Sequence, residues 1–440
     1  MSLAAPSPDR PLHSRRNVEL GLLILALIAG VGAYALVGLG KEEAVPPGVA
    51  GFGMLLAGGY AGAHLAVRRF APRADPVLLP VAALLTGIGF AVIYGLRPDL
   101  ASAQTGWLLF ALALFVATLV LIRDHRTLDA YTYTIGLLGI GLLLLPIVPG
   151  IGQEIRGARL WVDLGPIRFQ PAEIGKVLVV VFLASYLNAR KELLAVTTRR
   201  IGPIGLPEPK HLAPLVLAWG IALLVLFLER DLGSSVLFFG LFVVILWAAT
   251  ARGAYLGLGA ILFGVGSFLA YGAFAHVQDR VTVWLNALDP RFIQDEGFQL
   301  AQSVFALGTG GIAGTGLGQG HPEFIPDAHT DFVFSAVGEE LGLLGAMVIL
   351  LLFTLIVTRA LRTALARPES DGFGRLLATG LATILALQTF VIIGGVTRLI
   401  PLTGITLPFV SYGGSSLVAN FVLLALLIRV SAARSPEGGP

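Results

Sequence analysis

The 440-residue chain contains no cysteine and few charged residues. Without cysteine, disulfides, zinc thiolate sites and cysteine nucleophiles are excluded. Asp, Glu, Lys and Arg make up 13% of the residues, against roughly 25% in soluble domains. The basic residues are scattered over short loops, with no basic patch interleaved with aromatic side chains, so nucleic acid is not expected as a partner.

Hydrophobic residues, in contrast, make up 56% of the chain, and its mean hydropathy is +0.84. Apolar runs of about 20 residues recur, each long enough to cross a hydrocarbon core of roughly 30 Å as a helix. The sequence therefore predicts an all-α polytopic membrane protein. We predict spans near residues 18–39, 48–67, 77–96, 103–122, 130–149, 172–188, 212–228, 233–250, 253–275, 331–358, 374–397 and 413–430.

The placement of Lys and Arg predicts the orientation of these spans. Basic clusters at 190–210 and 359–375 fall on the side of the membrane that also holds both chain ends. Because inside loops carry the excess of Lys and Arg, we expect both termini in the cytoplasm. The polar loop at 276–330 is then extracytoplasmic.

This loop at 276–330 is the longest polar interruption of the chain. Loops beyond about 15 residues are uncommon in compact domains and tend to be functional, and the apolar residues of this one predict short helices packed on the membrane domain. Asp289 and Asp295 lie where turns are expected, next to Pro290 and Gly297. Either is a turn aspartate, or a carboxylate that takes a proton from a sugar hydroxyl or holds a divalent cation against a pyrophosphate.

The rest of the loop has two further parts. Gln299, Gln302 and Ser303 fall on one side of a predicted short helix, which reads as an interfacial amphipathic segment. The Gly-rich stretch that follows, GTGGIAGTGLGQG, either exposes backbone N–H groups to an anion or is a flexible loop. It lacks the Gly-Lys-Ser/Thr ending of a phosphate-binding P-loop.

Ionisable residues also fall inside or beside the apolar spans. Glu173 and Lys176 are three positions apart in the sixth span, close enough to pair on one helix face. Each alone would cost about 2.5–3.5 kcal/mol at mid-bilayer, so the pair either fixes a helix contact or lines a polar cavity. Arg159 just upstream is suited to a phosphate contact, whereas Trp161 is either an interfacial anchor or part of the same site.

The later polar positions leave similar alternatives. For Asp231 we favour a helix cap. His329, Asp331, Glu339 and Glu340 cluster around the predicted start of the tenth span, where they either cap and brace the helix or face a cavity. Residues 398–416, rich in Pro and Gly, predict a re-entrant wall, because such backbone is tolerated at membrane depth only inside protein or along a wet cavity.

Five motifs together resemble a known family. GARLWVDLGPIRFQPAEIGK, ERDLGSS, QLAQSVFALGTGGIAGTGLGQG, IPDAHTDFVFSAVGEELGLLG and PLTGITLPFVSYGGSS occur in the order found in the SEDS family, which includes RodA, FtsW and SpoVE. IGGVTRLIPLTG is most similar to the RodA-type branch of actinobacteria. The resemblance implies a bundle of ten core transmembrane helices, here at 75–431, preceded by an extra hairpin within 1–74 and followed by a cytoplasmic tail at 432–440.

The resemblance also implies a function. Members of the family are peptidoglycan glycosyltransferases of the bacterial cytoplasmic membrane, which polymerise lipid II at its outer face for cell shape or division and work with a class B penicillin-binding protein. A divalent cation, Mg²⁺ or Mn²⁺, is left open as a cofactor. A lipid II flippase is the alternative, because buried charges and broken helices suit transport as well.

The family's essential aspartate lies in the long outer loop. The stretch from Trp284 to Asp289 matches its context best, which ranks Asp289 first and Asp295 second as the catalytic carboxylate. The QPAEIGK element matches the family pattern at Glu173 and Lys176. The further candidate substrate contacts are Arg159, Trp161, Arg280, Gln299, Gln302, Ser303, His329, Asp331 and Glu339.

Overall fold

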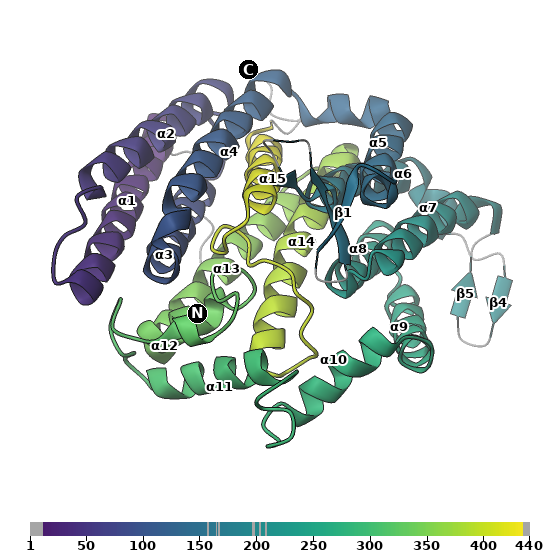
Figure 1. Cartoon of the computed structure of the whole chain (residues 1–440). Coiled ribbons are helices and arrows are strands. Elements are labelled where there is room, and N and C mark those ends of the chain that lie inside the picture. The colour runs from purple at the N-terminus through teal and green to yellow at the C-terminus, as the bar shows by residue number, and fades with distance from the viewer. Residues whose placement is uncertain are drawn as a thin grey trace.

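The computed structural model of the chain describes residues 12–155, 158–163, 165, 168–195, 199–201, 204–206 and 209–433. Within them the chain forms fifteen α-helices and five short strands (Figure 1). The helices are α1 (Leu12–Glu42), α2 (Val49–Phe70), α3 (Leu78–Leu96), α4 (Ala101–Leu121), α5 (Thr132–Leu144), α6 (Pro171–Ala195), α7 (Pro209–Leu228), α8 (Leu232–Thr250), α9 (Gly253–Ala273), α10 (Ala275–Asn286), α11 (Phe298–Gly310), α12 (Val333–Glu340), α13 (Gly342–Leu365), α14 (Gly372–Val396) and α15 (Gly414–Ala432).

Eleven helical segments of the described chain are long and apolar enough to cross a membrane. The helix α7 occupies the remaining predicted span. Four segments are largely enclosed: α3 and α15 bury 83% of their apolar windows, and α6 and α14 bury 72%. The other seven segments bury between 44% and 11% of their apolar windows, with the lowest value for α9, so many of their apolar side chains are left for lipid.

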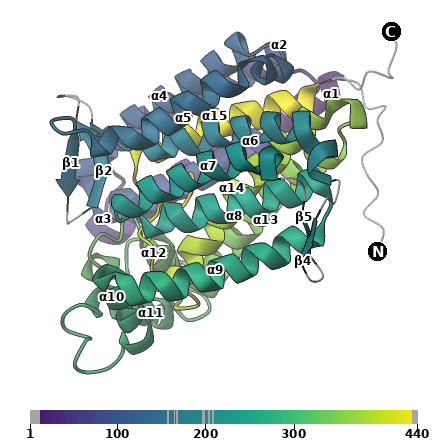
Figure 2. The same ribbon diagram turned by 90° about the vertical axis from the view of Figure 1, so that its right-hand side faces the viewer.

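The long helices run between two ends of the molecule (Figure 2). We call one end the terminal face: it carries the start of α1, the end of α15 and the strands β4 (Arg199–Ile201) and β5 (Ile204–Leu206). We call the other end the loop face. It carries α10, α11 and α12 and an antiparallel sheet of β1 (Gly152–Ile155), β2 (Ala158–Asp163) and β3 (Arg168–Phe169).

The sheets are additions to the all-α fold predicted from the sequence. In the loop-face sheet, Trp161 pairs with Gln153 and Asp163 pairs with Arg168. The alternating pattern of ARLWVD was the available signal, since alternation indicates a strand.

The tenth predicted span, 331–358, is wrong as one continuous helix. The structure breaks it into the buried α12 and the longer α13 at Gly342, whose φ is +65°. A Cβ at Gly342 would lie 2.3 Å from the backbone nitrogen of Gly314, so the Gly-rich loop packs directly against the break. Glycine allows both the left-handed backbone and this close approach.

The predicted wall is confirmed as irregular backbone enclosed by helices. Between α14 and α15 the chain has no regular structure over residues 400–406, and Leu407, Phe409 and Val410 are buried. Two helix glycines make room for it: a Cβ at Gly89 would meet the carbonyl oxygen of Val410 at 2.3 Å, and one at Gly233 would meet Ile405 at 2.3 Å. The wall therefore occupies the centre of the bundle near the loop face.

The N-terminal hairpin α1–α2 packs on the rest through α3 and α4. Gly30 and Gly87 let α1 and α3 touch at the backbone, since a Cβ on Gly30 would lie 2.9 Å from the Gly87 Cα atom. A buried polar cluster joins the helices near the terminal face: Arg16 donates to the Glu19 carboxylate and to the carbonyl oxygen of Ala74. The imidazole Nδ1 of His64 lies 2.7 Å from Glu19 Oε1.

Candidate functional site

A chain of buried polar side chains leads into the bundle from the loop face. Near the start of α6, Lys176 Nζ donates to Glu173 Oε2 at 2.6 Å and to Gln388 Oε1 on α14 at 2.8 Å. Gln388 in turn donates to the carbonyl oxygen of Thr406 in the wall at 2.8 Å. The predicted Glu173–Lys176 pair is thus confirmed, and it links two enclosed helices to the wall.

The turn between α7 and α8 adds two buried carboxyls. Asp231 accepts a hydrogen bond from the Ser234 backbone nitrogen at 2.8 Å, which confirms it as the cap of α8. Glu229 is 1% exposed, and neither of its carboxylate oxygens has a hydrogen-bond partner in the described structure. Burial raises the pKa of Glu229 to about 9, with the neighbouring Asp231 adding to the effect, so this carboxyl is neutral at physiological pH.

Arg280, on α10 of the outer loop, contacts the wall near these buried carboxyls. Its Nη1 donates to the Leu402 carbonyl oxygen in the wall at 2.7 Å. A Cβ placed on Gly404 would lie 3.6 Å from Asp331 Oδ2 and 3.9 Å from both Arg280 guanidinium nitrogens. Arg280 and Asp331 therefore flank the same point of the wall.

The charges of these residues act on one another. Burial raises the pKa of Asp231, Glu173 raises it further, and Arg280 opposes both. Burial lowers the pKa of Arg280, whereas Asp231 and Asp331 hold it up. We call this group, formed by Glu173, Lys176, Glu229, Asp231, Arg280, Asp331 and Gln388, the loop-face cluster.

The two candidate catalytic aspartates lie outside this cluster, on the segment between α10 and α11. Asp289 is tied to Arg291, whose Nη2 lies 2.8 Å from Oδ2 and whose backbone nitrogen donates to Oδ1 at 2.9 Å. These hydrogen bonds from Arg291 lower the pKa of Asp289 to about 2. Asp295 is exposed, and its carboxylate makes no hydrogen bond or ion pair within the described residues.

The predicted helix of the outer loop is present as α11 and packs on α12, α13 and α14. Ser303 is fully buried, 2.6 Å from the Ser335 hydroxyl, and donates to the Val396 carbonyl oxygen at 3.0 Å. Gln299 and Gln302 are partly exposed. In this structure Ser303 therefore fastens the outer loop to the bundle.

The Gly-rich stretch is neither a free anion nest nor a flexible loop, because its backbone is bound by α12. The Glu339 carboxylate accepts from the His321 backbone nitrogen at 2.9 Å, and Glu340 Oε1 accepts from that of Gly318 at 3.1 Å. The backbone oxygens of the same two glutamates accept from Thr315 and Gly316. These backbone N–H groups therefore donate to Glu339 and Glu340 at the end of α12, rather than to a bound anion.

His329 stands beside the last part of the wall. Its carbonyl oxygen accepts a hydrogen bond from the Tyr412 backbone nitrogen at 2.8 Å, and the two rings are 5.7 Å apart between centroids. The Ser411 hydroxyl donates to the next carbonyl oxygen, that of Thr330, at 2.6 Å. These bonds fix the segment that presents Asp331 to the cluster.

Arg159 and Trp161 are brought to the rim by β2. The exposed Arg159 guanidinium lies 3.2 Å from Glu154, and its backbone nitrogen donates to the Glu229 carbonyl oxygen at 3.4 Å. Trp161 is half-buried in the sheet. Among the described residues no group of three or more His, Asp or Glu side chains is arranged to hold a metal ion.

Two members of the cluster were missed from the sequence. Gln388 is a polar residue inside an apolar helix, as Lys176 is. Because its amide carries no charge, a search for ionisable residues in the spans does not find it. Glu229 lies next to the turn in which Asp231 was interpreted as a cap. The structure was needed to show that its carboxyl faces inward.

The fold and the cluster define a polytopic membrane protein with a buried polar site near one of its two faces. Residues 81–436 match the family of cell cycle proteins that comprises FtsW, RodA and SpoVE. The chain belongs to this family and is an integral membrane protein.

The chain is also similar to individual members of the family. The chain is 43% identical to the peptidoglycan glycosyltransferase RodA of Mycobacterium tuberculosis, over 97% of this chain and 92% of that protein. It resembles a chain of a peptidoglycan synthase complex, solved to describe coordination of polymerization and crosslinking, with a TM-score of 0.64, 29% identity and coverage of 81% of this chain and 97% of that chain. The rod shape determining protein RodA of Thermus thermophilus gives a TM-score of 0.56 at 28% identity, covering 81% and 96% of the two chains.

Proposed function

We propose that the chain polymerises lipid II into glycan strands at the loop face, which is then the outer face of the bacterial cytoplasmic membrane, with both termini in the cytoplasm. Its family membership and its likeness to RodA over nearly the whole chain make it a peptidoglycan glycosyltransferase. The observation that carries the proposed site is the loop-face cluster, a buried charged group at the loop-face end of the bundle that Arg280 connects to the carboxylate-bearing outer loop.

The proposed reaction transfers a growing glycan. The 4-hydroxyl of the acceptor sugar attacks the anomeric carbon of the donor, the bond from that carbon to the pyrophosphate oxygen breaks, and undecaprenyl pyrophosphate leaves. A carboxylate takes the proton of the attacking hydroxyl. Cations steady the charge that develops on the departing pyrophosphate, and Arg280, Arg159 and Lys176 are the candidates that the site offers.

We propose the opposite order of the two aspartates from the one that the sequence favours, on the basis of their contacts. A carboxylate with a pKa of about 2 is a weak base, and both oxygens of Asp289 are already engaged by Arg291. Asp295 is exposed and has no such partner in the described chain. We therefore propose Asp295 as the base or cation ligand and Asp289 as the residue that fixes the turn before it.

A partner is proposed on the same grounds. The related structure comes from a complex in which polymerization and crosslinking are coordinated, and a class B penicillin-binding protein would supply the crosslinking activity. Any requirement for Mg²⁺ or Mn²⁺ is to be tested by polymerisation in the presence of a chelator.

The polymerisation assay decides the assignment of the base. Purified full-length protein with the partner and lipid II is expected to make glycan polymer, and Asp295→Asn is expected to slow polymerisation by about 10²-fold or more, since a general base contributes roughly 10²–10⁴. Asp289→Asn should stay within about tenfold of the wild type, and Glu296→Gln serves as the matched control. A near wild-type rate in Asp295→Asn would refute the assignment, and a loss of about 10²-fold or more in Asp289→Asn alone would return the role of base to Asp289.

A lipid II flippase is the second candidate, favoured by the buried charges of the cluster and the broken helix at Gly342. The two are separated in liposomes that carry labelled lipid II on one side. Transbilayer movement without polymer formation would support transport and contradict the enzyme.

A further inference from the structure

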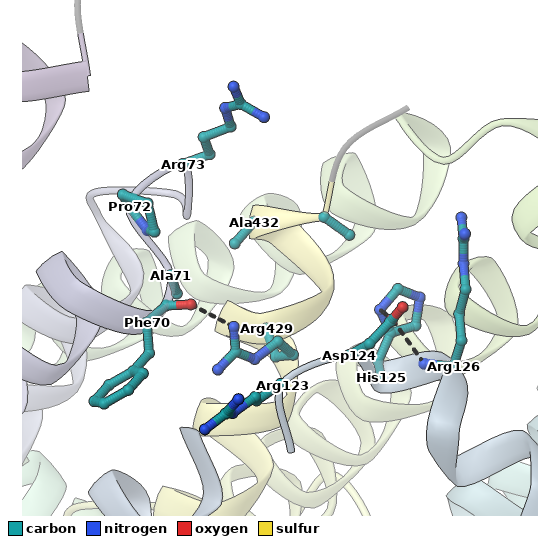
Figure 3. Close-up of a pocket in the computed structure, with 11 residues that line it drawn as sticks. Phe70, Ala71, Pro72, Arg73, Arg123, Asp124, His125, Arg126, Arg429 and Ala432 are labelled. Carbon is teal, nitrogen blue, oxygen red and sulfur yellow. Dashed lines mark hydrogen bonds and ion pairs between the residues drawn. The ribbon is translucent and has the colours of Figure 1, made fainter. Parts of the chain in front are cut away.

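A basic pocket opens on the terminal face, at the opposite end of the molecule from the loop-face cluster (Figure 3). Its volume is about 440 Å³, and it is formed where the ends of α2 and α15 meet the connection between α4 and α5. Four arginines and one aspartate are among its lining residues: Arg73, Arg123, Arg126, Arg429 and Asp124. The family's proposed reaction uses none of them.

The floor of the pocket is Arg429, which is 7% exposed. Its guanidinium donates to the carbonyl oxygens of Phe70 and Leu119, in the last turns of α2 and α4. Such bonds satisfy helix-end carbonyls, but they do not neutralise the charge, and the carboxylate that acts on it, Asp124, does so from a distance and without forming an ion pair. Within the described chain Arg429 makes no ion pair, and its Nε atom has no hydrogen-bond partner.

The other pocket arginines leave the positive charge largely uncompensated. Arg73 and Arg123 form no ion pair with any described residue. Arg126 lies 3.5 Å from Asp371, a carboxylate that His125 also contacts at 3.1 Å. Asp124 accepts the backbone hydrogen bond of Arg126 at 3.0 Å as a helix cap, so one exposed carboxylate faces several guanidinium groups.

Membrane topology alone does not account for this arrangement. Arginines on a cytoplasmic face follow from the positive-inside rule, and that rule is satisfied by cations extended into water, as Arg73 and Arg126 extend in Figure 3. It does not require a cavity, nor an arginine buried at its floor with an unused donor. A buried cation that is not directly paired is costly, the exposed Asp124 carboxylate compensates Arg429 only from a distance, and an anion in the cavity would offset the remaining cost.

We propose that the pocket binds a phosphate-bearing anion at the membrane boundary, either the headgroup of an anionic phospholipid or a free phosphate. Guanidinium forks match phosphate oxygens in pairs, and basic pockets between helices on the cytoplasmic side bind lipid headgroups. The Phe70 and Ala432 side chains supply an apolar border next to the arginines. Binding there would hold the N-terminal hairpin against α4 and α15.

The test is ligand-dependent thermal stability of the purified full-length chain in zwitterionic detergent and phosphate-free buffer. A ligand that binds only the folded state raises the unfolding midpoint as its concentration rises. One arm titrates short-chain phosphatidylglycerol against phosphatidylcholine, and the other titrates inorganic phosphate. The variants are Arg73→Gln/Arg123→Gln and the charge-matched control Arg252→Gln/Arg362→Gln, which removes two arginines of the same face outside the pocket.

We expect phosphatidylglycerol or phosphate, but not phosphatidylcholine, to raise the midpoint of the wild type and of the control. The pocket variant should need on the order of tenfold more ligand, as expected for the loss of two charge-assisted contacts. A response in the lipid arm alone identifies a headgroup site, and one in the phosphate arm alone a soluble anion. The proposal is overturned if neither anion stabilises the wild type, or if both double variants respond equally.

Discussion

Replacing Lys176 with methionine removes the ammonium that joins α6 to α14 and keeps a side chain of similar length. Lys176 is 2% exposed, and its partner Glu173 is 10% exposed at the side chain. Without the lysine, Glu173 is left as a buried carboxylate with no counter-charge. Breaking one side of a buried ion pair costs about 3–5 kcal/mol, and the lost bond to Gln388 adds roughly 1 kcal/mol.

The double variant Glu173→Gln/Lys176→Met removes both charges. Because replacing a whole buried pair is often close to neutral, we expect it to lie within about 2 kcal/mol of the wild type. The two single effects should therefore not add, and the coupling energy should be about 2 kcal/mol or more in a double-mutant cycle.

The free energy of unfolding is measured by denaturing-detergent titration of the purified protein, with polymerisation of lipid II recorded in parallel. Lys191→Met, on the same helix but at the terminal face, is the control and should cost less than about 1 kcal/mol. The reasoning fails if Lys176→Met costs as little as this control, or if the single effects simply add.

Three further predictions concern other buried features. Glu229 has a folded pKa of about 9 against an ordinary value near 4.5, so the folded state keeps a proton that the unfolded state releases. Between these values the stability of the wild type should fall by about 1.4 kcal/mol per pH unit relative to that of Glu229→Gln, and parallel pH curves for the two proteins would contradict this. Glu19→Ala leaves buried Arg16 unpaired and should cost roughly 3 kcal/mol by thermal unfolding. If it costs no more than the exposed control Glu42→Ala, the contacts of Arg16, Glu19 and His64 do not stabilise the hairpin. Gly89→Ala should displace the wall, with a loss of about 1–3 kcal/mol and slower polymerisation, whereas Gly106→Ala has open space around its added methyl and should behave as the wild type.

The N-terminal hairpin lies outside the part of the chain that the family match covers. The family match begins at residue 81, after α1 and α2. The alignment with the M. tuberculosis protein covers 97% of the chain, which leaves fewer residues unmatched than α1 alone contains, so it extends into the residues of the hairpin. The buried Arg16–Glu19–His64 contacts give the hairpin a physical attachment that its apolar sequence does not reveal.

The order of the helices and the kinds of residue at the site were determined by the sequence itself. Each span needs about 20 apolar residues, and this requirement is local, so hydropathy located twelve helical regions. A lysine and a glutamate inside an apolar helix must face a partner rather than lipid, which identified Lys176 and Glu173 before their contacts were known.

Only the tertiary structure decided which distant residues meet. Gln388, Leu402 and Arg280 come from three separate segments, and Arg429 meets Phe70 across 359 positions of the chain. The break at Gly342 depends on the backbone of Gly314, and the low basicity of Asp289 depends on how Arg291 folds back. These outcomes arise because close packing and hydrogen-bond geometry depend on positions in space, whereas hydropathy and spacing report only neighbours along the chain.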